Sequence, residues 1–178
     1  HHFHGPDGNP VSNDVAVAPP RRLRWVGSPR WSRHHDHMAS MSALVTANGR
    51  LFYIMDEGSR ASIQLPGKWA LIARDAFSGV VLWKRPIADW GWRAWRPQMK
   101  QMNWRRMRSY RCASPLSVPR RLVAAGDRVY VTLALEAPVT ALDAATGETI
   151  RTYPETNPAL EVITTGKTLL VVSGRWPT

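Results

Sequence analysis

Four consecutive residues near the N-terminus carry the side chains best suited to hold a metal ion, namely His34, His35, Asp36 and His37. Imidazole and carboxylate groups are the ligands that Zn²⁺ and other first-row metals use in proteins. Neighbouring residues of a strand point to opposite faces, so His35 and His37 would share one face and His34 and Asp36 the other. The cluster therefore predicts a metal site. Two alternatives stay open: a ligand pocket, and a structural loop in which the histidines bond to backbone and to Arg33.

A second unusual stretch interleaves tryptophan with arginine between residues 90 and 111. Aromatic rings alternating with guanidinium groups favour nucleic acids or anionic lipid surfaces. The same composition also suits a segment that covers a β-protein, because arginine stems pack on indole rings. A covering role, a contact with a protein, glycan or small ligand, and an anionic partner are therefore all open. The candidate contact residues are Trp92, Trp95, Arg96, Trp104 and Arg105.

The spacing of the apolar residues in this stretch is helical. Trp92, Trp95, Met99 and Met102 follow one another at three- and four-residue intervals. That spacing places them on one face of a helix between Arg93 and Met107.

The net charge of +11 is concentrated in this region. Residues 88–121 contain nine Lys or Arg and a single acidic residue, Asp89, which gives nine minus one, or +8, of the total. Residues 122–178 carry four basic and six acidic residues. A basic surface is typical of proteins that bind nucleic acid or anionic membranes. Here the positive charge belongs to one segment and not to the chain as a whole.

No catalytic signature is recognisable in the sequence. Cys112 is the single cysteine, which excludes an intrachain disulfide and any cysteine-based zinc or haem motif. A phosphate-binding loop, a Gly-x-Ser-x-Gly elbow and a pair of catalytic carboxylates are all missing. No run of about 18 apolar residues is present that would predict a membrane-spanning helix. The sequence therefore favours a binding or scaffold role over an enzyme.

A hairpin that occurs twice would position these segments. Residues 73–83 and 141–151 both read as strand, Asp-x-x-x-Gly turn and strand, around Asp75 and Gly79 in one copy and Asp143 and Gly147 in the other. The Asp side chain can cap the backbone N–H groups of the turn, and Gly supplies a positive φ. A hairpin repeated in this way indicates a repeat architecture.

Further strands surround each hairpin in the same order. In the first copy, strands over 43–46 and 51–55 flank Asn48-Gly49, a type I′ turn signal. The second copy has strands over 122–124 and 129–133, and a third copy starts with strands over 161–164 and 168–172. A short strand is also expected over 21–26. Gly126 and Gly166 lie 40 residues apart, the period of a four-stranded propeller blade.

These patterns predict an all-β fold, a partial β-propeller of about two and a half four-stranded antiparallel blades. We divide the chain into a lead-in and entry strand, a first blade, the basic Trp/Arg-rich insertion, a second blade and an incomplete third blade. Their expected boundaries are 1–41, 42–87, 88–119, 120–158 and 159–178.

The pattern Ala-x-Asp-x-x-x-Gly-x-x-x-Trp resembles the pyrroloquinoline-quinone-type (PQQ-like) propeller repeat of quinoprotein dehydrogenases and of BamB-like outer-membrane assembly proteins. Ala73, Asp75, Gly79 and Trp83 fit it fully. In the second copy Ala141, Asp143 and Gly147 fit, while Arg151 replaces the Trp. The resemblance covers residues 42–87 and 120–174. The segment Gly5-Pro6-Asp7-Gly8-Asn9 with Ser12 is also similar to the entry segment of such proteins.

The resemblance implies that the blade-docking residues are structural, with Trp83 plugging between neighbouring blades. It also implies a bacterial protein of the periplasm or cell envelope, and a chain that is a piece of a longer one. Its partners would then be the remaining blades or another protein chain, with nucleic acid or an anionic membrane as less favoured partners. PQQ with calcium is possible in a longer protein. The calcium ligands and vicinal cysteines of quinoprotein dehydrogenases are not recognisable here, so a PQQ-dependent oxidoreductase is the alternative function.

Overall fold

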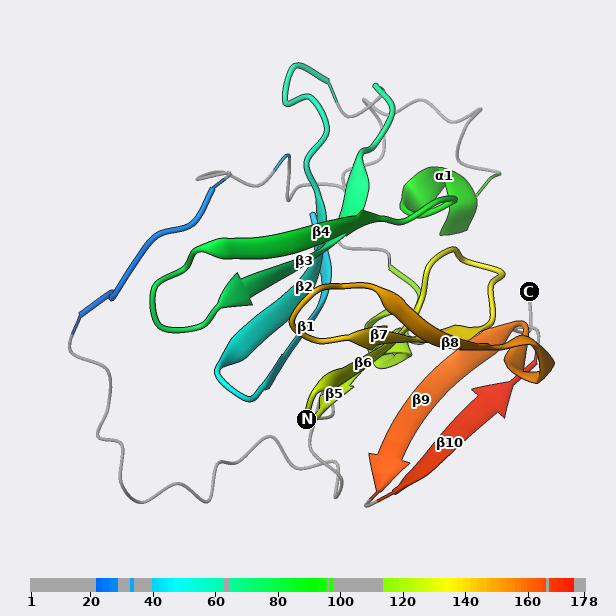
Figure 1. Cartoon of the computed structure of the whole chain (residues 1–178). Coiled ribbons are helices and arrows are strands. Elements are labelled where there is room, and N and C mark those ends of the chain that lie inside the picture. The colour runs from blue at the N-terminus through cyan, green and yellow to red at the C-terminus, as the bar shows by residue number, and fades with distance from the viewer. Residues whose placement is uncertain are drawn as a thin grey trace.

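The structure, a computed structural model, describes residues 22–28, 33, 40–62, 65–95, 97, 114–165 and 167–174. In this part of the chain ten strands form three antiparallel sheets (Figure 1). The first sheet contains β1 (Met41–Ala47), β2 (Arg50–Asp56), β3 (Trp69–Asp75) and β4 (Val81–Pro86). The second contains β5 (Leu122–Ala125), β6 (Arg128–Thr132), β7 (Val139–Asp143) and β8 (Thr149–Tyr153). The third contains β9 (Ala159–Thr165) and β10 (Thr168–Ser173).

The all-β prediction is confirmed. The strands of each four-stranded sheet lie side by side in chain order, joined by hairpins. The short helical elements among the described residues are α1 (Trp92–Trp95) and the 3₁₀ turns η3 (Val118–Arg121) and η4 (Pro154–Thr156). The Asn48-Gly49 turn has the two positive φ angles, 46° and 71°, that a type I′ hairpin requires.

The strand expected over 21–26 is a wrong prediction for its described part. Residues 22–28 belong to no sheet. Alternation alone cannot make a strand, because the backbone N–H and C=O groups must find a neighbouring strand. None of the strands described here pairs with this segment.

The three sheets pack face to face in chain order. One face of the first sheet, with Val45, Phe52 and Leu71, shares a buried cluster with Leu122 and Val131 of the second sheet. The opposite face of the second sheet packs on β9 and β10 in another buried cluster, formed by Val123, Val139, Ala159 and Val162 with Tyr130, Tyr153, Leu169 and Val171 around them. β5 accordingly contacts both β1 and β9. Alternate side chains of the central strands thus serve two different interfaces.

The two ends of the strands differ. At one end, which we call the turn end, tight hairpins connect the strands, and Asn48 donates from Nδ2 to Asp127 Oδ1 of the next sheet over 3.2 Å. At the other, the loop end, β2, β4 and β6 end and β3, β5 and β7 begin, so the longer connections between these strands start and finish there. α1 lies at this end in Figure 1. The repeated Asp-x-x-x-Gly turns and α1, part of the described start of the insertion, therefore lie at opposite ends of the sheets.

Candidate functional site

At the turn end, Asp75 forms the cap of the β3–β4 turn. Its Oδ1 accepts hydrogen bonds from the backbone N–H of Phe77 over 3.0 Å and of Ser78 over 2.7 Å, and from Ser78 Oγ over 2.7 Å. Gly79 follows with a φ of +75°. The hydrogen bonds from Ser78 and Phe77 lower the pKa of the Asp75 carboxyl below its ordinary value, with a small contribution from the charge of Arg24.

The second turn has the same geometry. Asp143 Oδ1 accepts from the backbone N–H of Ala145 over 2.8 Å and of Thr146 over 2.9 Å. Gly147 also has a φ of +75°. The backbone hydrogen bonds from Thr146 and Ala145 lower the pKa of Asp143. Both carboxylates are therefore engaged by their own turns.

Each turn receives an indole ring from the preceding part of the chain. Trp83 of β4 donates from Nε1 to the carbonyl of Ala144 over 3.1 Å, and a Cβ added to Gly147 would lie 2.6 Å from its Cδ2 atom. Trp25 donates from Nε1 to the carbonyl of Ala76 over 3.0 Å, and a Cβ added to Gly79 would lie 2.4 Å from its Cδ2 atom. Ala76 and Ala144 each follow the capping aspartate. The two contacts are therefore the same contact, made twice.

Guanidinium groups reinforce both contacts. Arg85 of β4 donates from Nη1 to the carbonyl of Gly147 over 2.7 Å. At the first turn Arg74 donates from Nη1 to the carbonyl of Gly79 over 2.6 Å and from Nη2 to that of Ser28 over 2.6 Å. A Cβ added to Gly27, the position that corresponds to Arg85, would lie 3.2 Å from Arg74 Cζ. Two arginines from different strands thus bind equivalent carbonyl groups.

On the second sheet, Arg151 of β8 occupies the position that Trp83 has on the first. Its guanidinium lies 4.9 Å from the ring centroid of Tyr153, two residues further along β8. Tyr153 corresponds in turn to Arg85. The described residues beside them provide no Asp-x-x-x-Gly turn, since the third sheet consists of β9 and β10 alone.

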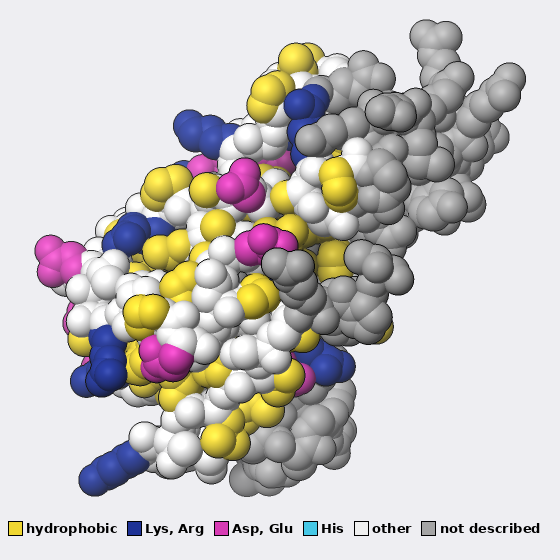
Figure 2. Space-filling view, turned by 90° about the vertical axis from the view of Figure 1, so that its right-hand side faces the viewer, with side chains coloured by type: hydrophobic (Ala, Val, Ile, Leu, Met, Phe, Trp, Pro, Cys, Tyr) yellow, Lys and Arg dark blue, Asp and Glu magenta, His cyan; other side chains and the backbone are white. Residues whose placement is uncertain are grey.

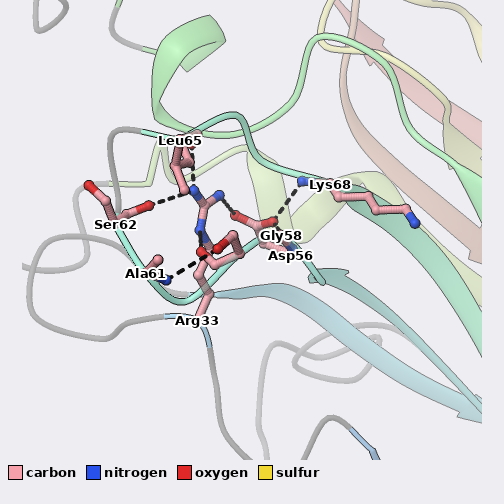
Figure 3. Close-up of polar contacts among 8 residues, drawn as sticks. Arg33, Asp56, Gly58, Ala61, Ser62, Leu65 and Lys68 are labelled. Atoms are coloured by element: carbon pink, nitrogen blue, oxygen red, sulfur yellow. Dashed lines mark hydrogen bonds and ion pairs between the residues drawn. The ribbon is translucent and has the colours of Figure 1, made fainter.

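At the loop end, Arg33 and Asp56 form a buried ion pair (Figure 3). Arg33 Nη1 lies 2.8 Å from Asp56 Oδ2, and the side chains are 2% and 5% exposed. Arg33 also donates to the carbonyls of Ser59, Ser62 and Leu65. Asp56 Oδ1 accepts from the backbone N–H of Gly58 and Lys68. The guanidinium and both carboxylate oxygens therefore have partners within the protein. The pair holds the β2–β3 loop in place and leaves no free group for a ligand.

The predicted metal cluster His34, His35, Asp36 and His37 lies outside the described residues. It directly follows Arg33 in the sequence. Within the described ranges no group of three or more His, Cys, Asp or Glu side chains is arranged to hold a metal ion. The metal site stays a prediction.

Of the insertion residues singled out from the sequence, Trp92 and Trp95 are described and Arg96, Trp104 and Arg105 are not. Trp92 and Trp95 are buried in the cluster between the first two sheets. The ring of Trp95 lies 5.5 Å from that of Trp69 and 6.0 Å from that of Trp90, whose Nε1 donates to Ser42 Oγ over 3.1 Å. The start of the insertion therefore covers the loop end of the core. The helix expected between residues 93 and 107 is described only as α1.

Several donors near the loop end are buried without an acceptor among the described residues, namely Trp95 Nε1, Ser114 Oγ, Arg121 Nε and Thr132 Oγ1. Arg121 donates from Nη1 to the carbonyl of Leu135 over 2.5 Å and from Nη2 to Ser117 Oγ over 3.4 Å. Burial lowers the pKa of the Arg121 guanidinium, and the charge of Glu136 opposes this. Arg121, the last residue of η3 directly before β5, thus places a buried cation where Ala43 of β1 stands in the first sheet.

Sequence reasoning missed the Arg33–Asp56 pair and the docking role of Trp25. The pair has no sequence signal, because an Arg and an Asp 23 positions apart meet only through the fold. Trp25 did have a sequence signal. In Leu23-Arg24-Trp25 an apolar residue lies two positions before the Trp, as in Val81-Leu82-Trp83 at the start of β4.

We find no match to this chain among protein-family models, and none among curated proteins. In the described part of the chain no helix has the length and apolar character to cross a membrane. Function must therefore be inferred from the geometry of the described residues.

Proposed function

We propose that this chain forms part of a PQQ-like β-propeller that acts as a non-catalytic binding or scaffold module of a bacterial envelope compartment. One observation carries the proposal: an indole of the preceding segment sits on the glycine of an Asp-x-x-x-Gly turn in two successive sheets, Trp25 on Gly79 and Trp83 on Gly147. A contact that recurs once per sheet favours a ring of blades, because each unit docks on its neighbour by the same rule.

The state of the polar groups supports a non-catalytic role. Asp75 and Asp143 cap turns, and Asp56 is neutralised by Arg33. A general base or nucleophile needs a free, positioned group that can reach a substrate. The carboxylates that the repeat provides at fixed places are instead bonded to backbone N–H groups. Binding is therefore expected at the loop end, where segments outside the repeat are presented on a rigid scaffold.

The purified protein, titrated with PQQ and Ca²⁺, tests the assignment against an oxidoreductase. We expect no bound quinone absorbance and no dye-linked oxidation of alcohols. Quinone absorbance together with turnover would overturn the non-catalytic assignment. A crystal structure of the protein at its natural full length tests the propeller, and an open stack of sheets would contradict a ring.

The basic insertion supports a second candidate function, binding to an anionic polymer or membrane surface. Residues 88–121 supply +8 of the net charge. The test measures affinity for DNA and for phosphatidylserine vesicles at increasing salt concentration. A steep fall in affinity, with a slope of log affinity against log salt on the order of the number of phosphate contacts, would favour this function. Salt-independent or undetectable binding would exclude it.

A further inference from the structure

The second sheet departs from the first at one pair of positions near the loop end. In the first sheet Ala43 of β1 and Ile54 of β2 are Cα partners, and both belong to the buried apolar cluster between the first two sheets. Counted from the hairpin turn, the matching residues of the second sheet are Arg121, directly before β5, and Thr132, the last residue of β6. Arg121 is 4% and Thr132 0% exposed. A buried apolar pair is thus replaced by two buried polar side chains.

The described residues include three buried arginines, and their guanidinium groups differ in how fully they are bonded. Arg33 and Arg74 each donate hydrogen bonds from all three side-chain nitrogens. Arg121 donates from Nη1 to the carbonyl of Leu135 over 2.5 Å, but from Nη2 only to Ser117 Oγ over a long 3.4 Å. Its Nε has no acceptor among the described residues. Arg121 is therefore the buried arginine with donors left unused.

The unused donors of Arg121 lie along one edge of its guanidinium. Nε and Nη2 form this edge, and their parallel N–H groups match the two oxygens of a carboxylate. No carboxylate of the described residues forms an ion pair with Arg121. Burial lowers the pKa of this guanidinium, and the exposed Glu136 opposes that effect through its charge. The buried cation thus lacks the counter-charge that Asp56 gives to Arg33.

Thr132 provides a further unused donor at the same place. The pairing of β5 with β6 sets Thr132 opposite Arg121, and η3 contacts β6. Oγ1 of Thr132 has no partner in the described part of the chain, whereas the hydroxyls of the buried Thr140 and Thr156 are both bonded. A guanidinium edge and a hydroxyl that both need an acceptor are therefore neighbours.

The fold does not require polar groups at this place. The first sheet closes the equivalent place with Ala43 and Ile54, which are 3% and 0% exposed. A buried donor without an acceptor and a buried charge without a counter-charge both destabilise a protein. Such groups mark places where a sequence serves a purpose other than stability. A ligand with a negatively charged acceptor satisfies both groups at once.

We propose that Arg121 and Thr132 bind the carboxylate group of a small organic acid at the loop end of the second sheet. The inference rests on the binding role proposed above and assigns a ligand class to it. Two carboxylate oxygens would accept from Nε and Nη2 of Arg121, and one of them also from Thr132 Oγ1. Since η3 also contacts β9, the ligand would lie close to the third sheet.

Charge and burial define this ligand further. One guanidinium compensates one negative charge, so a monocarboxylate fits the site better than a doubly charged phosphate or sulfate. Both side chains are almost fully buried, which restricts the ligand to a small molecule. Figure 2 faces the side of the molecule on which β9 and β10 lie, and there acidic and basic side chains are interspersed. The attraction for an anion is therefore expected from the buried Arg121 and not from a basic surface patch.

Titration of the full chain with sodium acetate tests the proposal. Sodium chloride keeps the ionic strength constant at neutral pH, and ¹H–¹⁵N NMR follows the Nε–H signal of Arg121. We expect a saturable downfield shift of this proton and a melting temperature that rises with acetate concentration. Arg121→Lys keeps the charge but removes the planar fork, so acetate affinity should fall on the order of 10-fold. Arg120→Met, which removes the neighbouring and more exposed arginine, is the matched control and should bind acetate as the parent protein does.

Thr132→Val tests the hydroxyl while the shape of the side chain is kept. Acetate affinity should fall on the order of 10-fold, since a hydrogen bond to a charged group is lost. The ligand-free variant should melt at the same temperature as the parent protein or higher, because an unsatisfied buried donor has been removed. This variant tests the site even if substitutions of Arg121 prevent folding. Glu136→Gln removes a nearby negative charge and should tighten acetate binding about twofold.

An Arg121 signal that does not respond to acetate would overturn the proposal, as would an equal response to sodium sulfate. A ligand-free Thr132→Val protein that melts at a clearly lower temperature would also overturn it, because the hydroxyl would then have an acceptor within the chain. None of these results would affect the proposed scaffold role. Quinone-dependent turnover would refute the non-catalytic role and leave the acetate data unchanged.

Discussion

At the scale of single residues, the same small set of side chains solves the same problem twice. An aspartate caps the turn, a glycine with positive φ brings the backbone close, and an indole lies on that glycine and donates to the carbonyl after the aspartate. The glycine has two functions, because an added Cβ would collide with the indole and would also strain the backbone.

Trp83→Ala should destabilise the protein by about 2–4 kcal/mol, since it removes the packing on Gly147 and Phe52 and leaves the Ala144 carbonyl without its donor. Urea unfolding measures this. Leu82→Ala, an exposed neighbour on the same strand, is the control and should change stability by less than about 0.5 kcal/mol. Equal effects of the two substitutions would contradict a docking role for the indole.

Gly147→Ala separates the two functions of the turn glycine when it is compared with Gly126→Ala. Both positions have positive φ, but a Cβ at Gly126 has no atom within 4 Å. Gly126→Ala should therefore lower the stability by about 1 kcal/mol through backbone strain alone. Gly147→Ala should lower it by clearly more, because the added Cβ also meets the indole of Trp83. Equal losses in thermal unfolding would show that the approach of Trp83 carries no energy.

Asp75 and Asp143 make stability depend on pH in the acid range. Their pKa values are lowered in the folded state, so their contribution is present above the unfolded value of about 3.9 and is lost as the pH falls through the folded value. In the double variant Asp75→Asn, Asp143→Asn, the asparagine side chains can still cap the turns. Between about pH 5 and about pH 2 the variant should therefore lose less stability than the parent protein. Identical melting profiles of variant and parent against pH would contradict this.

At the scale of elements, the β2–β3 loop is held by the Arg33–Asp56 pair and not by its own sequence. Arg33 binds three loop carbonyls, and Asp56 binds the N–H groups at both sides of the loop. Arg33 directly precedes the His34–His37 cluster in the sequence. A residue far from any repeat position therefore organises part of the loop end.

Arg33→Met should cost about 3 kcal/mol or more, because it leaves the Asp56 carboxylate buried without its counter-charge. Lys84→Ala, which breaks the more exposed pair with Glu57, provides the control and should cost less than about 1 kcal/mol. Both values come from urea unfolding. Similar losses of stability in the two variants would contradict a role of the buried pair in holding the β2–β3 loop.

At the scale of the whole molecule, the described sheets form a stack in which each interface uses the face that the previous one left free. The first two sheets share one buried cluster and should unfold together, whereas the third has two strands among the described residues. A two-stranded hairpin is marginal without neighbours, so β9 and β10 depend on their contact with the second sheet.

Native-state hydrogen exchange should resolve this order. The amides of β2, β3 and β6 are expected to exchange only by global unfolding. The amides of β10 should exchange through a local opening whose free energy is on the order of half the free energy of global unfolding. Val123→Ala at the interface with β9 should accelerate β10 more than β2. Uniform protection of all three sheets would contradict a weakly held third sheet.

The sequence by itself determined the local structure. Asn48-Gly49 and the two Asp-x-x-x-Gly turns require particular backbone angles, and alternating apolar residues between them leave few alternatives to strands, so the all-β fold and the order of its hairpins could be predicted. These signals lie within a few residues of one another. The spacing of Arg151 after Gly147 also identified the place where the second copy departs from the first.

Only the tertiary structure decided which residues meet across the chain. Trp25 reaches the turn of the first sheet, Arg33 meets Asp56, and Leu44 is exposed where Leu122 is buried. None of these follows from spacing, because side-chain contacts between distant segments depend on how the sheets pack. The physical reason is that a strand has two similar faces, and its sequence does not state what each face will cover.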